Sequence, residues 1–167
     1  ASKRMKTLFL GRHAKSSWES AAETDYDRPL NERGERNAPE MGRRLADKYP
    51  PPDHFAASTA LRAQATAEIL ARQWGFPGEI EWRRDLYESA TSQLLDLIRD
   101  FDDAHASAAI VAHNPTITFL ANLLGNLPIP NVPTCGIVVL KGPASWKSFE
   151  PGAAETLEFD FPKNKPT

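Results

Sequence analysis

The sequence contains a single cysteine, Cys135, among its 167 residues. One cysteine excludes an internal disulfide and any zinc site built mainly on thiolates. Long hydrophobic runs are missing as well. The apolar stretch behind the basic start, residues 8–10, is far shorter than the core of a signal peptide or a membrane span. With nothing that directs the chain elsewhere, we expect a cytoplasmic protein.

A surplus of positive charge is also absent. The 20 lysines and arginines are balanced by 22 acidic residues, which gives a net charge of -2. Proteins that bind nucleic acid as their main partner usually carry a basic excess, so we expect neither nucleic acid nor membrane as a partner. Apolar residues make up 41% and charged residues 25%, which is typical of a globular domain. The length favours one domain over residues 1–167, with a monomer as the default.

Strand-like and helical patterns alternate along the chain. Strands are predicted over residues 7–10, 55–58, 108–112 and 136–140, with a weaker one over 79–82 and a possible edge strand over 156–161. Helices are predicted over residues 32–49, 60–74, 92–101 and 115–124. Because the strands are continuous apolar runs, we predict an α/β fold of three layers, α/β/α, in which helices flank a mostly parallel central sheet.

Unusual polar residues follow three of the predicted strands. Arg12 and His13 come after the strand over residues 7–10. Arg62 lies at the head of the helix after the strand over 55–58, and His113 follows the strand over 108–112. Taken singly, such residues are more often structural or solvated. In a parallel sheet, however, the carboxyl ends of the strands meet at one edge, which is where ligands bind. The pattern therefore predicts a cluster of two arginines and two histidines.

A cluster of this kind needs an anion, and phosphate fits best. Arginine forks match phosphoryl oxygens, and free amides follow Asn114, a predicted helix N-cap with Pro115 in the first helical position. Lys15 and Ser16, within three residues of His13, are candidates for further contacts to the substrate. Flanking arginines would repel a cation, and no carboxylate or cysteine stands at ligand spacing near either histidine, so we expect no metal and no cofactor.

These residues resemble a known family. The order and spacing of Arg12-His13, Arg62 and His113 resemble the histidine phosphatase superfamily, whose fold is that of phosphoglycerate mutase. Three segments are similar to the SixA-type phosphohistidine phosphatases in particular: Arg-His-Ala-Lys-Ser at 12–16, Asp-Tyr-Asp-Arg-Pro-Leu-Asn-Glu-Arg-Gly at 25–34 and Val-Ala-His-Asn-Pro at 111–115. The likeness spans most of the chain.

The resemblance implies a covalent mechanism. His13 would attack phosphorus in line and form a phosphohistidine intermediate that water then hydrolyses. Arg12, Arg62 and His113 would neutralise the charge spread over the equatorial oxygens, which is most of what phosphoryl transfer asks of a protein. Arg12 and Arg62 would also bind the substrate, together with Lys15, Ser16 and Asn114 beside them.

The proton donor for the leaving group is open at this point. Glu88 is one candidate, because Leu86-Tyr87-Glu88 resembles the Leu-x-Glu segment that carries the acid in superfamily members. An exposed loop carboxylate is the alternative interpretation of Glu88. Asp25 and Asp27 compete with it, although Asp27 beside Arg28 is better explained as a local ion pair.

The substrate class follows from length and resemblance. Few residues between 62 and 88 are left to build a lid, so we expect an open site, which can accept a phosphorylated side chain on another protein. By resemblance, the substrate is phosphohistidine on a signalling protein. The alternatives are a phosphatase for small phosphate esters and a phosphate-binding module without turnover. His54 and His105 precede strands and are predicted at the opposite edge of the sheet.

Overall fold

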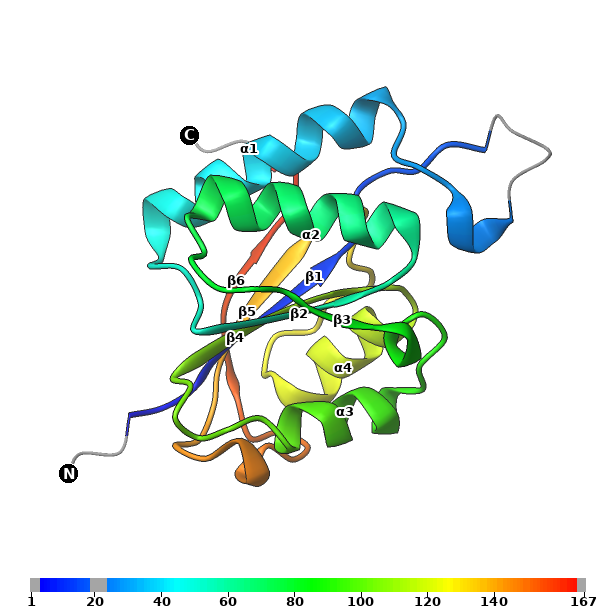
Figure 1. Ribbon diagram of the computed structural model, residues 1–167. Helices are drawn as coiled ribbons and strands as arrows, with labels where there is room; N and C mark the ends of the chain where they lie inside the picture. Colours follow the sequence, from blue (N-terminus) through cyan, green and yellow to red (C-terminus); the bar gives the residue numbers. More distant parts are fainter. Residues whose placement is uncertain (1–3, 19–23, 165–167) are drawn as a thin grey trace.

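The structure, a computed structural model, describes residues 4–18 and 24–164. A six-stranded sheet forms its centre, with helices along both faces (Figure 1). The strands are β1 (Thr7–Arg12), β2 (His54–Ser58), β3 (Glu81–Arg83), β4 (Ser107–Ala112), β5 (Ile137–Lys141) and β6 (Glu155–Asp160). The helices are α1 (Glu32–Lys48), α2 (Leu61–Trp74), α3 (Thr91–Arg99) and α4 (Thr116–Leu124), with short 3-10 turns η1 (Asp25–Asp27), η2 (Arg84–Leu86) and η3 (Trp146–Ser148).

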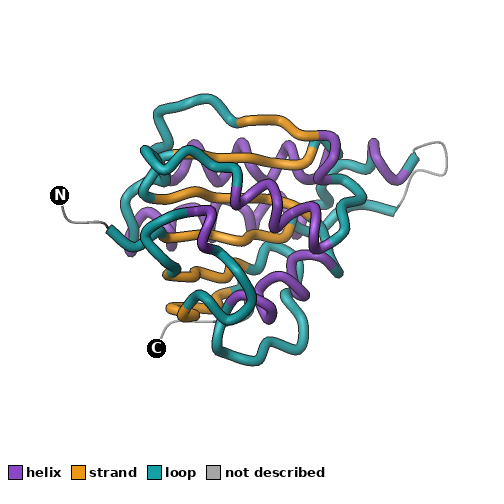
Figure 2. Tube along the Cα trace, turned by 90° about the horizontal axis from the view of Figure 1, so that it is seen from below, coloured by secondary structure: helices purple, strands orange, loops and turns teal. Residues whose placement is uncertain are grey.

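The layers are those predicted. Helices α1 and α2 cover one face of the sheet, and α3 and α4 cover the other (Figure 1). The strand order is β3-β2-β4-β1-β5-β6, and the view from below shows the strands side by side (Figure 2). The fold is therefore α/β, with a mostly parallel sheet and an edge strand, β6, where residues 156–161 predicted one.

One strand departs from the parallel arrangement. β5 runs antiparallel to both β1 and β6, whereas β1, β2, β3 and β4 pair in parallel. The loop between α4 and β5 explains the reversal. It returns to the carboxyl edge of the sheet, where Val132 accepts hydrogen bonds from Arg12 and Asn114, so that β5 starts at that edge.

The middle of the sheet is buried on both faces. Along β1, Leu8 and Leu10 pack towards α3 and α4, while Phe9 packs towards α1 and α2, as the alternation of a strand requires. Burial of each such side chain is worth about 1.5–3 kcal/mol. Within the described residues, no helix has the length and apolar character needed to cross a lipid bilayer. This packed centre fixes where the strand ends lie.

The turn after β1 is held against the start of α1. The Asn31 side chain caps this helix by accepting from the Gly34 amide at 2.9 Å, and the Asn31 amide donates to the Lys15 carbonyl at 3.0 Å. A Cβ at Gly34 would come within 2.2 Å of that same carbonyl oxygen. Only glycine fits there, and the close approach fixes the backbone two residues beyond His13.

Candidate active site

The carboxyl ends of β1, β2 and β4 bring the predicted cluster together. His13, Arg62 and His113 are all buried, although each is polar. The ring centroids of His13 and His113 lie 5.0 Å apart, and Arg62 Nε lies 3.4 Å from His13 Nε2. Residues from three separate strand ends thus meet at one point, as the sequence pattern predicted.

His13 is arranged as a neutral nucleophile. Its Nδ1 lies 2.8 Å from the carbonyl oxygen of Ala14. A carbonyl only accepts hydrogen bonds, so Nδ1 carries the proton and Nε2 keeps its lone pair. Burial, aided by the nearby His113 and arginines and opposed by the Ala14 hydrogen bond, lowers the pKa of His13 to about 3. The imidazole is therefore uncharged at neutral pH, and its Nε2 accepts a hydrogen bond from Arg62 Nε.

Arg62 is fixed at the start of α2. Its terminal nitrogens donate to Asp25, Nη1 to the carbonyl oxygen at 2.6 Å and Nη2 to Oδ2 at 3.0 Å. The backbone around it is tied to the turn after β1, because Thr66 Oγ1 donates to the Arg62 carbonyl and accepts from the Ala14 amide. These bonds fix the position of Arg62 relative to His13.

Arg12 supplies a second guanidinium with a free donor. Its Nη1 donates to the Val132 carbonyl at 3.1 Å, while its Nε is buried and has no hydrogen-bond partner among the described residues. Burial and the nearby charge of Arg62 both lower the pKa of Arg12. Two cations close together, with a buried donor unsatisfied, indicate a site for an anion.

His113 also has an unpartnered ring nitrogen. Its Nε2 lies 2.8 Å from Ser58 Oγ, which accepts from the Ala60 amide, and its Nδ1 is buried without a partner in the described part of the chain. If the serine hydroxyl donates to Nε2, Nδ1 carries the proton and can donate to a bound oxyanion. Burial first, and then the charge of Arg62, lower the pKa of His113 to about 4.

Other predicted binding residues are engaged elsewhere or exposed. Ser16 Oγ accepts from Arg28 Nη1 at 2.6 Å, and the Lys15 side chain is exposed to solvent. The side-chain Nδ2 of Asn114 donates to Asn131 Oδ1 and to the Val132 carbonyl, so it joins the start of α4 to the loop before β5. Direct contacts of these three side chains with phosphate stay predictions.

The predicted start of α4 is wrong by one residue. The helix begins at Thr116, and Pro115 occupies the N-cap position instead of the first helical one. Asn114 still supports the helix, because its Oδ1 accepts from both the amide and the hydroxyl of Thr118. The Asn114 side chain therefore caps the helix from one residue before the N-cap position.

The three candidate carboxylates have different surroundings. Asp25 accepts from Tyr87, Arg62 and Arg28, and chiefly the Tyr87 hydrogen bond lowers its pKa to about 2. Asp27 accepts from Thr24 Oγ1. The expected Asp27–Arg28 ion pair is wrong, because the turn of η1 places Asp25, three residues before the arginine, at 3.0 Å from it.

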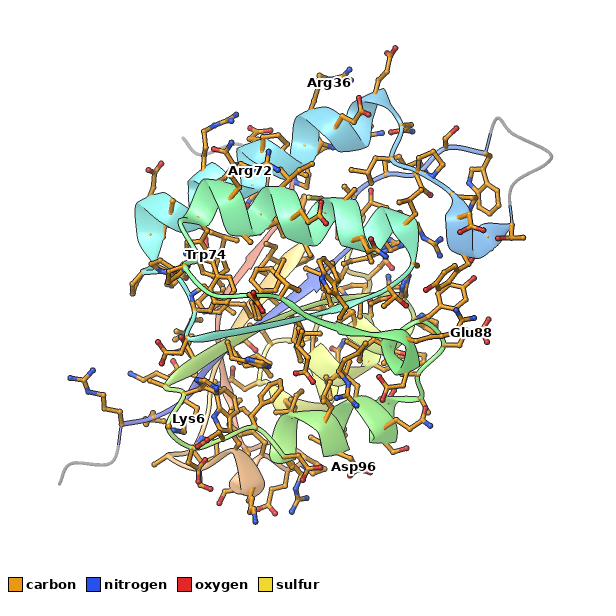
Figure 3. The ribbon with its side chains drawn as sticks, in the orientation of Figure 1. Lys6, Arg36, Arg72, Trp74, Glu88 and Asp96 are labelled. Atoms are coloured by element: carbon orange, nitrogen blue, oxygen red, sulfur yellow. The ribbon has the colours of Figure 1, made fainter. Side chains whose placement is uncertain are left out.

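Glu88 lies at the margin of the molecule on the loop after η2 (Figure 3). Its side chain is exposed and makes no hydrogen bond or ion pair within the described residues. The geometry matches the exposed loop carboxylate of the alternative interpretation. A role as proton donor stays a prediction.

Sequence reasoning missed Tyr87. Its ring stands edge-on to His113 with centroids 5.5 Å apart, the Arg62 guanidinium carbon lies 5.9 Å from its centroid, and its hydroxyl donates to Asp25. The available signal was its place beside Glu88 in the Leu-x-Glu segment. Tyr87 forms a wall of the site.

Comparison with known proteins settles the family. Residues 8–94 match the model of the histidine phosphatase superfamily, branch 1. The chain belongs to this superfamily. The uncharacterized protein Rv1276c of Mycobacterium tuberculosis is 32% identical over 162 residues, with 91% of this chain and 99% of the relative covered. The uncharacterized protein ML1117 of Mycobacterium leprae is 30% identical over 164 residues, with the same coverage of 91% and 99%.

Solved structures narrow the assignment to the SixA type. A crystal structure of SixA from Agrobacterium tumefaciens, described as a candidate phosphohistidine phosphatase, is 29% identical, with a TM-score of 0.80 and coverage of 94% of this chain and 98% of the other. The protein histidine phosphatase SixA complexed with tungstate has the same fold at 21% identity, with a TM-score of 0.76 and coverage of 93% and 97%. This member of the superfamily is of the SixA type, and the matches support phosphatase activity.

Proposed function

We propose that this histidine phosphatase is a metal-independent enzyme that removes phosphoryl groups from phosphohistidine on a signalling protein and carries them on His13. One observation supports the covalent step above all. The His13 imidazole is neutral, its Nδ1 is bound to the Ala14 carbonyl, and its Nε2 faces Arg62 at 3.4 Å. We extend the proposal to a cytoplasmic monomer whose partner is the phosphorylated protein.

The reaction has two displacements at phosphorus. In the first, the lone pair of His13 Nε2 forms a bond to phosphorus while the bond to the leaving group breaks. In the second, water attacks the phosphohistidine, which releases inorganic phosphate and restores the imidazole. Arg12, Arg62 and His113 donate to the equatorial oxygens in both steps, and no metal ion is required for that charge neutralisation.

The proton supply favours phosphohistidine over alkyl esters. Asp25 is ionised at neutral pH, and Glu88 is exposed and makes no hydrogen bond or ion pair within the described residues. An alkoxide leaving group needs a proton from a positioned acid. The imidazole of phosphohistidine can instead take up a proton from solvent on its other nitrogen before it departs. The description of structural neighbours as phosphohistidine phosphatases supports the same substrate.

A substrate panel tests this proposal. We expect kcat/KM to be highest for a phosphohistidine-bearing protein, lower for an aryl phosphate and lowest for an alkyl phosphate, with no change when EDTA is added. Glu88→Gln should spare phosphohistidine even if it slows the esters. A preference for alkyl phosphates would favour the alternative of a phosphatase for small esters, and binding without turnover would favour a phosphate-binding module.

A further inference from the structure

The carboxylate of Asp25 joins three segments of the chain. Its Oδ1 accepts from Arg28 in the same loop, at 3.1 Å from Nε and 3.0 Å from Nη2. Its Oδ2 accepts from Arg62 on α2 at 3.0 Å and from the hydroxyl of Tyr87 after η2. A carboxylate has about four lone-pair sites, and three hydrogen bonds and one close ion-pair contact surround this one.

The same contacts determine how Arg62 points. Both terminal nitrogens of its guanidinium donate to Asp25, one to the carbonyl and one to the carboxylate, while its Nε faces His13 Nε2. The far end of the planar group is held in this way, so its Nε edge, whose hydrogen bonds to His13 Nε2 here, is the edge that a phosphoryl group on His13 would meet.

Among the described residues, no other side chain than Asp25 and His13 makes a hydrogen bond to the Arg62 guanidinium. The guanidinium is buried beside Arg12 and His113, both of which lack an acidic partner in the part of the chain that the structure describes. Without the carboxylate, the guanidinium would keep only its hydrogen bonds to the Asp25 carbonyl and to His13, and its orientation would be less firmly fixed.

We propose that Asp25 is a positioning residue, whose carboxylate aims the Arg62 guanidinium at the phosphoryl group on His13. This inference rests on the proposed covalent mechanism and adds a residue to it. Positioning of this kind is valuable because a donor that is already oriented needs no reorganisation as charge develops in the transition state.

The role differs from that of a general acid. A proton on Oδ2 would displace the hydrogen bonds from Arg62 and Tyr87, so the geometry favours the ionised carboxylate. An acid would serve the leaving group and matter most for poor leaving groups. A residue that aims Arg62 acts on the equatorial oxygens, which are the same in every phosphoryl substrate. Its loss should therefore lower kcat/KM by a similar factor for all substrates.

The test compares Asp25→Asn with Asp27→Asn, a matched variant in the same turn, whose carboxylate accepts a hydrogen bond, within the described residues, only from Thr24 Oγ1. Asparagine is nearly isosteric but cannot accept from both arginines. For Asp25→Asn we expect kcat/KM to fall about 10- to 100-fold for every member of a series of aryl phosphates with graded leaving groups. Inhibition by tungstate should weaken by at least 10-fold, whereas Asp27→Asn should change each quantity less than twofold.

Two results would overturn the inference. A loss that grows with the pKa of the leaving group would make Asp25 a general acid. If tungstate inhibition were unchanged in a variant shown by circular dichroism to be folded, Asp25 would not position Arg62 and would only stabilise its own loop. Failure of the mechanism itself is separate, because it would show in the wild type as turnover that survives His13→Ala, whatever Asp25→Asn does.

Discussion

Two pairs of histidines lie at opposite edges of the same sheet. The rings of His13 and His113, at the carboxyl edge, have centroids 5.0 Å apart and an interplanar angle of 51°. The rings of His54 and His105, at the other edge, are 5.1 Å apart and stacked at 15°. Distance alone does not distinguish the pairs.

Their neighbours do. His54 Nε2 lies 2.9 Å from a carboxylate oxygen of Glu81, so that its polar atom is satisfied within the protein. His13 and His113 face Arg62 and Arg12 instead, and Nδ1 of His113 has no hydrogen-bond partner in the part of the chain that the structure describes. A histidine pair beside a carboxylate is a structural contact, whereas a pair beside two arginines is suited to bind an anion. The following predictions test this contrast, from the largest effect to the smallest.

Loss of the nucleophile should have the largest effect. We expect His13→Ala to lower kcat for an aryl phosphate by at least about a thousandfold, because the covalent route is closed. His105→Ala, from the other pair, should leave kcat within twofold. Steady-state kinetics on both purified variants measure the difference. Equal losses in the two would mean that the pairs do not differ in role.

The guanidinium fork should matter next. Arg62→Lys keeps the positive charge but loses the planar set of donors, so we expect kcat/KM to fall about 100-fold. Arg83→Lys is the matched control, because Arg83 pairs with Glu81 and Asp85 on the surface. Full activity of Arg62→Lys in the same assay would show that charge without geometry is sufficient.

The buried pair should also make stability depend on pH. The pKa of His113 is lowered to about 4, below its ordinary value of 6.5, so the unfolded chain binds a proton that the folded chain does not between these values. The free energy of unfolding should therefore fall as the pH drops from 6.5 to 4. In urea titrations, His113→Gln should reduce this slope by up to about 1.4 kcal/mol per pH unit. If the free energy of unfolding depended on pH equally in the variant and the wild type, the lowered pKa of His113 would be refuted.

The structural pair should give the smallest effect on activity. His54→Ala removes the bond to Glu81 and the ring stack, so we expect the free energy of unfolding to drop by about 1–2 kcal/mol. Because these contacts lie at the far edge of the sheet, kcat/KM should stay within twofold. Urea denaturation and the aryl phosphate assay provide the two readouts, and a tenfold loss of activity would remove the distinction between the edges.

Much of the fold could be predicted because local patterns carry it. Apolar runs such as residues 108–112 and the alternation of strands with helices indicated the layers, and even the edge strand at residues 156–161 was visible. The direction of β5 was not, because it depends on where the preceding loop ends. That path is set by contacts of Val132 with Arg12 and Asn114, which are distant in sequence.

The site divides in the same way. Residues that directly follow strands, His13 and His113, could be found because strand ends share an edge. The partners of Arg62 could not be predicted, because Asp25 and Tyr87 contact it from loops, and no periodic sequence pattern indicates the conformation of these loops. The side chain of Ser16 likewise turns to Arg28, a contact that proximity to His13 in the sequence does not reveal.

The central claim is that His13 Nε2 becomes the phosphoryl carrier. The most direct measurement is rapid acid-free quenching of the wild-type enzyme with a phosphoryl donor, followed by peptide mass spectrometry under alkaline conditions that preserve phosphohistidine. We predict one acid-labile phosphoryl group on the peptide that contains His13, with the peptides of His54, His105 and His113 unmodified. Turnover with no phosphoryl group on His13, or with one on another histidine, would contradict this account.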